Sequence, residues 1–154
     1  MIIGIDPGTA IVGFACVEGT RKMPQIVDYG VITTTARATE FMPQRLCEIA
    51  DDLTELLKKH RPSLAIVEDL FFFKNVKTVI SVAQARGVIL QTLCAHGVEI
   101  RSMTPLQVKQ TITGFGRAQK KQVQTMVKKY YGLNEIPKPD DAADALAMAW
   151  CGLK

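Results

Sequence analysis

Three predicted β-strands follow one another in the first 33 residues with only short connections between them. Apolar, mostly β-branched residues fill positions 2–5, a second run covers 11–18, and a third covers 25–33 after a predicted turn over 19–24. A strand can return parallel to its predecessor only through a crossover of about a dozen or more residues. We therefore predict an antiparallel meander of three neighbouring strands at the start of the fold.

A long amphipathic helix is predicted after the meander. Apolar residues recur at the spacing i, i+3, i+4 and i+7 across residues 38–60, and the pattern ends at Arg61 and Pro62. The next apolar run, residues 64–68 (LAIVE), predicts a buried strand. Because the helix is long enough for a right-handed crossover, we expect this fourth strand to lie parallel to the first.

The rest of the chain combines helical patterns with one more strand. A short fifth strand is predicted over 98–101, and helices are predicted over 75–96, 104–113, 118–131 and 139–150. The predicted fold class is α/β, a five-stranded mixed sheet with three antiparallel strands and then parallel strands, flanked by helices. A length of 154 residues suits a single domain, residues 1–154.

The composition excludes a disordered chain, because 47% of the residues are hydrophobic and 22% are charged. No apolar run approaches the roughly 18 residues of a membrane helix, and no basic region leads into an apolar run at the N-terminus. We therefore expect a cytoplasmic protein without membrane contact. The four cysteines, Cys16, Cys47, Cys94 and Cys151, have apolar neighbours and no Cys-x-x-Cys pair, which predicts buried free thiols.

Acidic residues end two of the predicted buried strands. Asp6 closes the first strand, and no Lys or Arg precedes Arg21 to pair with it. Glu68 closes the fourth strand, while Asp69 faces the opposite side because successive strand side chains alternate. We expect Asp6 and Glu68 to meet at one edge of the sheet. The alternative for Asp6 is a cap of the turn that follows it.

The predicted last helix carries three further acids in its first turns. Pro139 and Asp140 mark its start, and an Ala-rich stretch follows that can pack closely against a sheet. Asp141 and Asp144 are three residues apart and Asp140 and Asp144 are four apart, so either pair can share one helix face. Helix capping is the alternative role of the first two acids. Asp144, one turn into the helix, is placed to reach the strand-end carboxylates.

Convergence of Asp6, Glu68, Asp141 and Asp144 would create a strong demand for cations. Two like charges about 4 Å apart repel by roughly 4 kcal/mol at an effective dielectric constant of 20. Ligand sets made only of oxygen select Mg²⁺ or Mn²⁺, and two such ions roughly 3.5 to 4 Å apart suit an in-line phosphoryl displacement. The acids therefore predict metal-dependent chemistry on a phosphodiester.

The charge of the chain is concentrated in one segment. Residues 101–138 contain eight Lys or Arg residues and one acid, Glu135, although the whole chain has a net charge of only +4. Such a segment is typical of polyanion binding, and a solvated, soluble surface is the alternative. The aromatic run at 71–73 either packs in the core or stacks on bases beside a nucleic-acid site.

Five segments together resemble the RuvC-type Holliday junction endonucleases, and the resemblance spans nearly the whole chain. The segments are GIDPGT, AIVEDLFF, NVKTVISVAQARG, PLQVKQTITGFGRAQKKQVQ and DDAADALAMA. The resemblance implies a ribonuclease H-like fold, a homodimer and a requirement for Mg²⁺, for which Mn²⁺ can substitute. It implies paired symmetric nicks that leave 5′-phosphomonoesters at a four-way DNA junction, in homologous recombination and DNA repair. It also implies a branch-migration motor complex as partner.

The resemblance also assigns roles to single residues. It places the catalytic, metal-ligating acids at Asp6, Glu68, Asp141 and Asp144, where matching the DAAD motif selects Asp141 over Asp140. It places a DNA-contacting aromatic at Phe71 and active-site lysines at Lys109 and Lys120. The full set of expected DNA-binding residues is Phe71, Lys74, Lys109, Arg117, Lys120 and Lys121.

Three other functions remain possible at this point. Another ribonuclease H-like nuclease, such as one that trims ribosomal RNA precursors, would share the strand-end Asp and would prefer single-stranded RNA. The GIDPGT turn also resembles the phosphate-binding turn of sugar-kinase and chaperone ATPases, which need two such domains. A non-catalytic junction-binding protein is the third alternative, and four retained acids argue against it.

Overall fold

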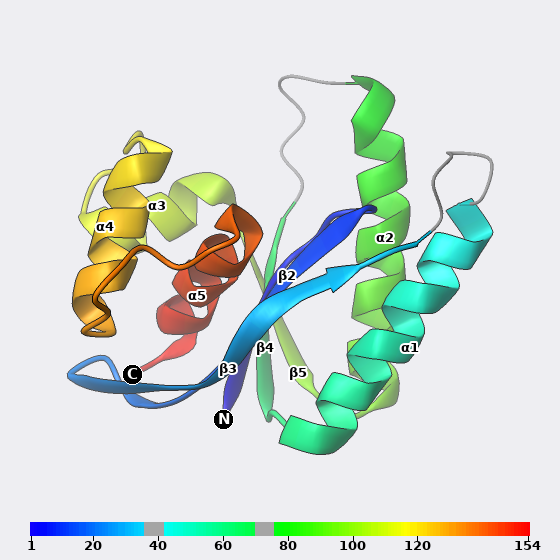
Figure 1. Cartoon of the computed structure of the whole chain (residues 1–154), viewed down its shortest axis with the longest axis horizontal. Coiled ribbons are helices and arrows are strands. Elements are labelled where there is room, and N and C mark those ends of the chain that lie inside the picture. The colour runs from blue at the N-terminus through cyan, green and yellow to red at the C-terminus, as the bar shows by residue number, and fades with distance from the viewer. Residues whose placement is uncertain (36–41, 70–75) are drawn as a thin grey trace.

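The computed structural model describes residues 1–35, 42–69 and 76–154, which form one mixed sheet with helices on both faces (Figure 1). The strands are β1 (Ile2–Asp6), β2 (Ile11–Thr20), β3 (Met23–Thr33), β4 (Leu64–Glu68) and β5 (Glu99–Met103). The helices are α1 (Met42–His60), α2 (Val76–Ala95), α3 (Pro105–Thr113), α4 (Lys120–Tyr130) and α5 (Asp140–Gly152). Every predicted strand and helix is present, although several end at other residues than expected.

The sheet has the order β3-β2-β1-β4-β5 and the predicted mixed topology. Antiparallel pairing joins β1 to β2 and β2 to β3, whereas β4 is parallel to both β1 and β5. The predicted turn over 19–24 is wrong in extent, because Gly19 still pairs with Pro24 and Thr20 with Met23. The left-handed backbone of Gly19, with φ of 87°, accommodates the tight reversal that follows.

Helices α1 and α2 cover one face of the sheet, and α3, α4 and α5 lie over the other (Figure 1). Side chains alternate along β1, so Ile3 and Ile5 are fully buried beneath α1 and α2. On the opposite face a Cβ added to Gly4 would overlap the backbone of Ala145 and Ala149. The Ala-rich α5 therefore packs directly on β1, and this contact sets the position of its acidic first turn.

The prediction of four buried thiols is wrong for two of them. Cys16 and Cys151 are buried, but Cys47 on α1 and Cys94 on α2 are exposed. Burial on a helix depends on the angle around its axis, so apolar neighbours in the sequence do not guarantee that a residue faces the core. Within the described ranges, no helix combines the length and apolar composition that a membrane crossing needs.

Candidate active site

Two carboxylates lie side by side at the carboxyl ends of parallel strands. Asp6 ends β1 and Glu68 ends β4, and the register of the two strands pairs Ile5 with Val67, directly before them. Both side chains belong to the sheet face that α5 covers, because they alternate with core residues of the other face. The Asp6 and Glu68 side chains lie close enough to change each other's pKa. The predicted meeting of these two acids is thus present.

The first turns of α5 bring further carboxylates to this edge. A Cβ on Gly13 of β2 would overlap the Asp141 carbonyl, so the helix start lies close against the sheet. Asp144 and Asp141 both act on Asp6 and raise its pKa. Asp140 instead accepts a hydrogen bond from Gln124 at 3.1 Å and has an exposed side chain. The packing of α5 therefore favours Asp141 over Asp140 as the residue that faces the strand-end acids.

Burial and like charge together raise the pKa values of these acids. Desolvation is the largest cause for Asp6, and the charges of Glu68, Asp144 and Asp141 add to it, which raises the pKa of Asp6 to about 8. Desolvation and the charge of Asp144 raise the pKa of Glu68 to about 6. Desolvation also raises the pKa of Asp144. The folded chain thus holds carboxylates that lack sufficient positive charge around them.

Two lysines approach the same acids from α3 and α4. The Nζ atom of Lys120 lies 2.9 Å from Asp144 Oδ2 and 3.3 Å from Asp140 Oδ2. Desolvation lowers the pKa of Lys120, but its contacts with Asp144 and Asp140 outweigh this effect, and the net pKa is raised. The charge of Lys109 lowers the pKa of Glu68. Both lysines line a cleft of about 170 Å³ together with Glu68 and Asp144.

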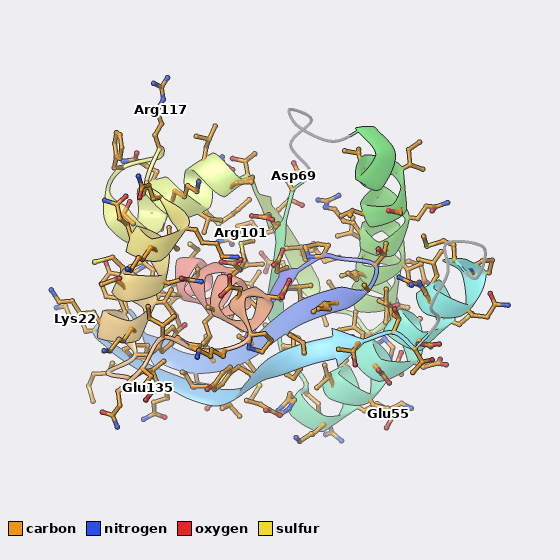
Figure 2. All side chains as sticks on the ribbon, turned by 45° about the horizontal axis from the view of Figure 1, so that its top comes forward. Lys22, Glu55, Asp69, Arg101, Arg117 and Glu135 are labelled. Atoms are coloured by element: carbon orange, nitrogen blue, oxygen red, sulfur yellow. The ribbon has the colours of Figure 1, made fainter. Side chains whose placement is uncertain are left out.

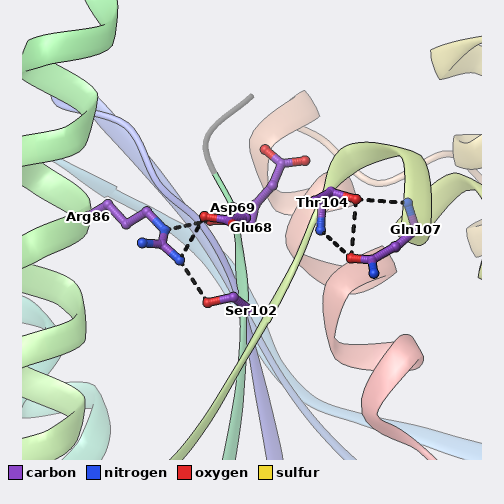
Figure 3. A network of polar contacts seen from close by, with 6 residues as sticks. All are labelled: Glu68, Asp69, Arg86, Ser102, Thr104 and Gln107. Atoms are coloured by element: carbon purple, nitrogen blue, oxygen red, sulfur yellow. Dashed lines mark hydrogen bonds and ion pairs between the residues drawn. The ribbon is translucent and has the colours of Figure 1, made fainter. Parts of the chain in front are cut away.

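The start of α3 explains the position of Lys109. Thr104 caps the helix, since Thr104 Oγ1 accepts from the Gln107 backbone N–H at 3.3 Å (Figure 3). The Gln107 side chain in turn accepts from the Thr104 backbone N–H at 2.8 Å, and Pro105 occupies the first helical turn. This capping box begins α3 directly after β5. Lys109 follows in the next turn and faces the cleft.

The oxygen ligands of this site suit a divalent cation, although the described side chains are not gathered closely enough to hold one. Within the described ranges, no three Asp, Glu, His or Cys side chains stand together closely enough to hold an ion. The ammonium group of Lys120 pairs with Asp144 instead. Asp6, Glu68, Asp144 and Asp141 nevertheless offer only oxygen ligands in a partly buried, acidic setting. Mg²⁺ and Mn²⁺ prefer such ligands, and an ion at Asp144 would compete with Lys120.

The other expected DNA-binding residues are distributed around this edge. Lys121 lies in the exposed first turn of α4, and Arg117, between α3 and α4, projects away from the body of the molecule (Figure 2). Lys128 and Lys129 lie about two turns further along α4, roughly 12 Å from Lys120. The basic segment is therefore not a single patch at the cleft. Phe71 and Lys74 lie outside the described residues.

The sequence analysis missed Arg86 of α2. Its Nε donates to the Glu68 carbonyl at 2.9 Å, and its Nη2 donates to Ser102 Oγ at 2.7 Å and lies 3.1 Å from Asp69 Oδ1 (Figure 3). The available signal was a charged residue in the middle of a mostly apolar helix. Asp69 faces Arg86 rather than the other acids, as strand alternation predicted.

Comparison with known proteins identifies the family. The family model described as crossover junction endodeoxyribonuclease RuvC matches residues 2–152. The chain belongs to the RuvC family. It is 55% identical over 148 residues to the RuvC of Fusobacterium nucleatum, covering 96% of this chain and 76% of the relative. It is 49% identical over 152 residues to the RuvC of Syntrophomonas wolfei, covering 99% and 87%. Both relatives are crossover junction endodeoxyribonucleases.

Solved RuvC structures share the fold described above. Thermus thermophilus RuvC in complex with a Holliday junction substrate matches with a TM-score of 0.84 and 29% identity, covering 97% of this chain and 90% of that chain. The yeast mitochondrial Holliday junction resolvase Ydc2 matches with a TM-score of 0.70 and 13% identity, covering 97% and 77%, which indicates a common fold alone. The predicted fold class and the resemblance to RuvC are confirmed.

Proposed function

We propose that this RuvC-family chain is a Mg²⁺-dependent endodeoxyribonuclease that resolves four-way DNA junctions by paired symmetric nicks. The observation that carries the proposal is the group of partly buried carboxylates, Asp6, Glu68 and Asp144, whose pKa values are all raised at one edge of the sheet. A group of acids like this does not stabilise a protein core, because ionising each carboxyl there costs more free energy than it does in water. The same group beside two lysines suits a phosphodiester held by metal ions.

Each residue of the site receives a role in this proposal. Asp6, Glu68, Asp141 and Asp144 would hold two divalent ions, with Mg²⁺ as the metal and Mn²⁺ as a substitute. When bound, the ions activate water and neutralise charge on the scissile phosphate. Lys109 and Lys120 line the cleft and contact phosphate oxygens. Their positive charges stabilise the negative charge that develops during cleavage, and this effect is strongest where bulk water is excluded.

The wider DNA contact involves the basic residues around the cleft. Lys121 and Arg117 are both exposed and bind the phosphate backbone of the junction arms. Phe71 and Lys74 complete the set, with the Phe71 ring stacking on or between bases. Loss of a backbone-contacting lysine is expected to weaken binding to all DNA sequences about equally.

Paired nicks require two active sites, and we place the second in a homodimer. Helix α2 exposes apolar surface, including Ile80 with 66% of its area accessible, which is typical of a helix that packs against a partner. A twofold dimer presents two identical sites to a junction whose arms are themselves related by approximate twofold symmetry. A branch-migration motor complex is the further partner that the resemblance implies, and the cytoplasm is the expected location.

Cleavage of a defined set of substrates tests this proposal. The purified full chain is incubated with a labelled synthetic four-way junction, a matched linear duplex and single-stranded RNA, each in Mg²⁺ and in EDTA. Symmetric nicks that occur only in the junction and only with Mg²⁺ support the proposal. Cleavage of RNA alone would instead indicate an RNA-processing nuclease, and junction binding without nicks in any metal would indicate a non-catalytic binder.

A further inference from the structure

One guanidinium group joins three elements at the end of β4. Arg86 of α2 keeps only 16% of its side chain exposed, and it contacts the Glu68 carbonyl, the Asp69 carboxylate and the Ser102 hydroxyl of β5 at 2.9, 3.1 and 2.7 Å (Figure 3). An arginine head has five donors in a rigid, planar fork, which suits several fixed acceptors at once. A lysine, with a single nitrogen, cannot reproduce this arrangement.

These contacts act on the last peptide group of the strand. The backbone N–H of Asp69 donates to the Met103 carbonyl at 2.8 Å, which is the final hydrogen bond that ties this end of β4 to β5. Arg86 holds the carbonyl of the same peptide unit, that of Glu68. Both polar groups of the Glu68–Asp69 peptide are therefore fixed, and the backbone dihedrals that aim the Glu68 side chain are fixed with them.

The two side chains at this strand end point to opposite faces of the sheet. The Asp69 carboxylate faces α2 and Arg86, while the Glu68 carboxylate faces Asp6 and the cleft. The cations whose charge lowers the pKa of Glu68 are Lys109 and Lys120, which lie on the cleft side. Arg86 thus contacts the backbone carbonyl of Glu68, and it acts on this residue by fixing the backbone that carries the side chain.

We propose that Arg86 is a positioning residue that fixes the Glu68 carboxylate for divalent-cation binding. The inference rests on the proposed role of Glu68 as a metal ligand. Groups that orient a ligand from behind change metal affinity by about 10- to 100-fold when they are removed.

The test compares Arg86→Lys and Ser102→Ala with a matched control, Arg101→Lys. Arg101 lies on the neighbouring strand β5, has 56% of its side chain exposed and pairs with Glu99 of its own strand at 3.4 Å. The first measurement is amide hydrogen exchange at Asp69 in the metal-free full chain. The second is the Mg²⁺ concentration that gives half of the maximal thermal stabilisation, and the third is the Mg²⁺ concentration that gives half-maximal junction cleavage.

We expect Arg86→Lys to speed exchange at Asp69 and to raise both Mg²⁺ midpoints by about 10- to 100-fold. Ser102→Ala, which keeps two of the three contacts, should shift both midpoints in the same direction by less, and Arg101→Lys should shift neither. Junction binding in EDTA should be unchanged in all three variants. If Arg86→Lys does not fold, the two Mg²⁺ midpoints of Ser102→Ala test the inference in its place.

A lower melting temperature with unchanged Mg²⁺ midpoints would overturn the inference, because Arg86 would then only brace α2 against the sheet. Failure of the proposed function gives a different result, namely a wild-type chain that cleaves no junction. In that case the Mg²⁺ midpoint for thermal stabilisation still measures the effect of Arg86 on cation binding.

Discussion

Two aspartates on different strands of the same sheet have opposite electrostatic environments. Asp28 of β3 lies 2.9 Å from Lys59 Nζ and 2.9 Å from His60 Nε2, and the hydrogen bond from Lys59 is the main cause of its lowered pKa. Asp6 of β1 lies among other acids, and its pKa is raised to about 8. Asp28 is a structural carboxylate whose charge is paired within its own chain, whereas Asp6 lies among acids and is neutralised only by a proton or by an added cation.

Of the two aspartates, Asp28 contributes to the stability of the fold, whereas Asp6 is placed for function. Positive charge at the end of α1 stabilises the fold through Asp28, where it also complements the helix dipole. The strand-end edge instead concentrates negative charge at a cost to the metal-free fold. Acids that destabilise a protein persist where the reaction requires them.

The largest expected effect is loss of cleavage in Asp6→Asn and Glu68→Gln. Loss of a metal ligand should remove several kcal/mol of transition-state stabilisation, which corresponds to a rate lower by about 10³-fold or more. Junction binding in EDTA should survive, because the basic residues bind DNA. The matched control is Asp28→Asn, which should cleave at the wild-type rate. Equal loss of cleavage in the control and in Asp6→Asn would remove the distinction between the two aspartates.

A smaller effect on the cleavage rate should distinguish Asp141 of α5 from the adjacent Asp140. Asp141→Asn should lower junction cleavage by about 10²-fold, the rate equivalent of about 3 kcal/mol. Asp140→Asn removes only exposed contacts with Gln124 and Lys120, which are worth about 0 to 1 kcal/mol, so its rate should fall by about fivefold at most. Single-turnover rates at saturating Mg²⁺ measure both. The opposite ranking would identify Asp140 as the ligand.

The raised pKa of Asp6 predicts how the metal-free fold responds to pH. A folded carboxyl with a pKa of about 8, against 3.8 in the unfolded chain, holds its proton more tightly when folded, so stability falls as pH rises from about 4 through 8. From pH 6 to pH 8 the loss in EDTA should be about 2 kcal/mol. Urea unfolding at the two pH values measures it.

Two comparisons make this pH experiment decisive. Asp6→Asn should be the more stable protein at pH 8 in EDTA, because an amide has no charge to bury. Saturating Mg²⁺ should stabilise the wild type more at pH 8 than at pH 6, since ions bind the deprotonated carboxylates. A wild type whose stability is independent of pH over this range would contradict the raised pKa of Asp6.

The smallest expected effect belongs to Asp28. Its lowered pKa means that the folded state favours the charged carboxylate, so this stabilisation is present above pH 3.8 and is lost as pH falls through the folded pKa. Asp28→Asn should therefore lose about 1 kcal/mol of stability at pH 7 and little near pH 3. Thermal unfolding at both pH values tests the sign, which is opposite to that of Asp6→Asn.

Much of the fold could be predicted from local patterns. The period of two residues in strands and of 3.6 in helices reports burial directly, which is why all ten elements were found in order. Short connections required the antiparallel meander, and alternation placed Glu68 rather than Asp69 on the side of Asp6. The extent of the β2–β3 turn was not predictable, because Gly19 and Pro24 are typical turn residues that here pair with each other as part of the two strands.

The sequence by itself determined which acids end the buried strands and which helices carry the basic residues. Only the tertiary structure shows that Asp141, and not Asp140, acts on Asp6, because both acids share a helix face with Asp144 and their orientation depends on how α5 packs against Gly13. The contact of Lys120 with Asp144 and the hold of Arg86 on Glu68 were likewise decided by tertiary structure. Each joins residues from different elements, and spacing along a chain carries no record of which side chains folding brings together.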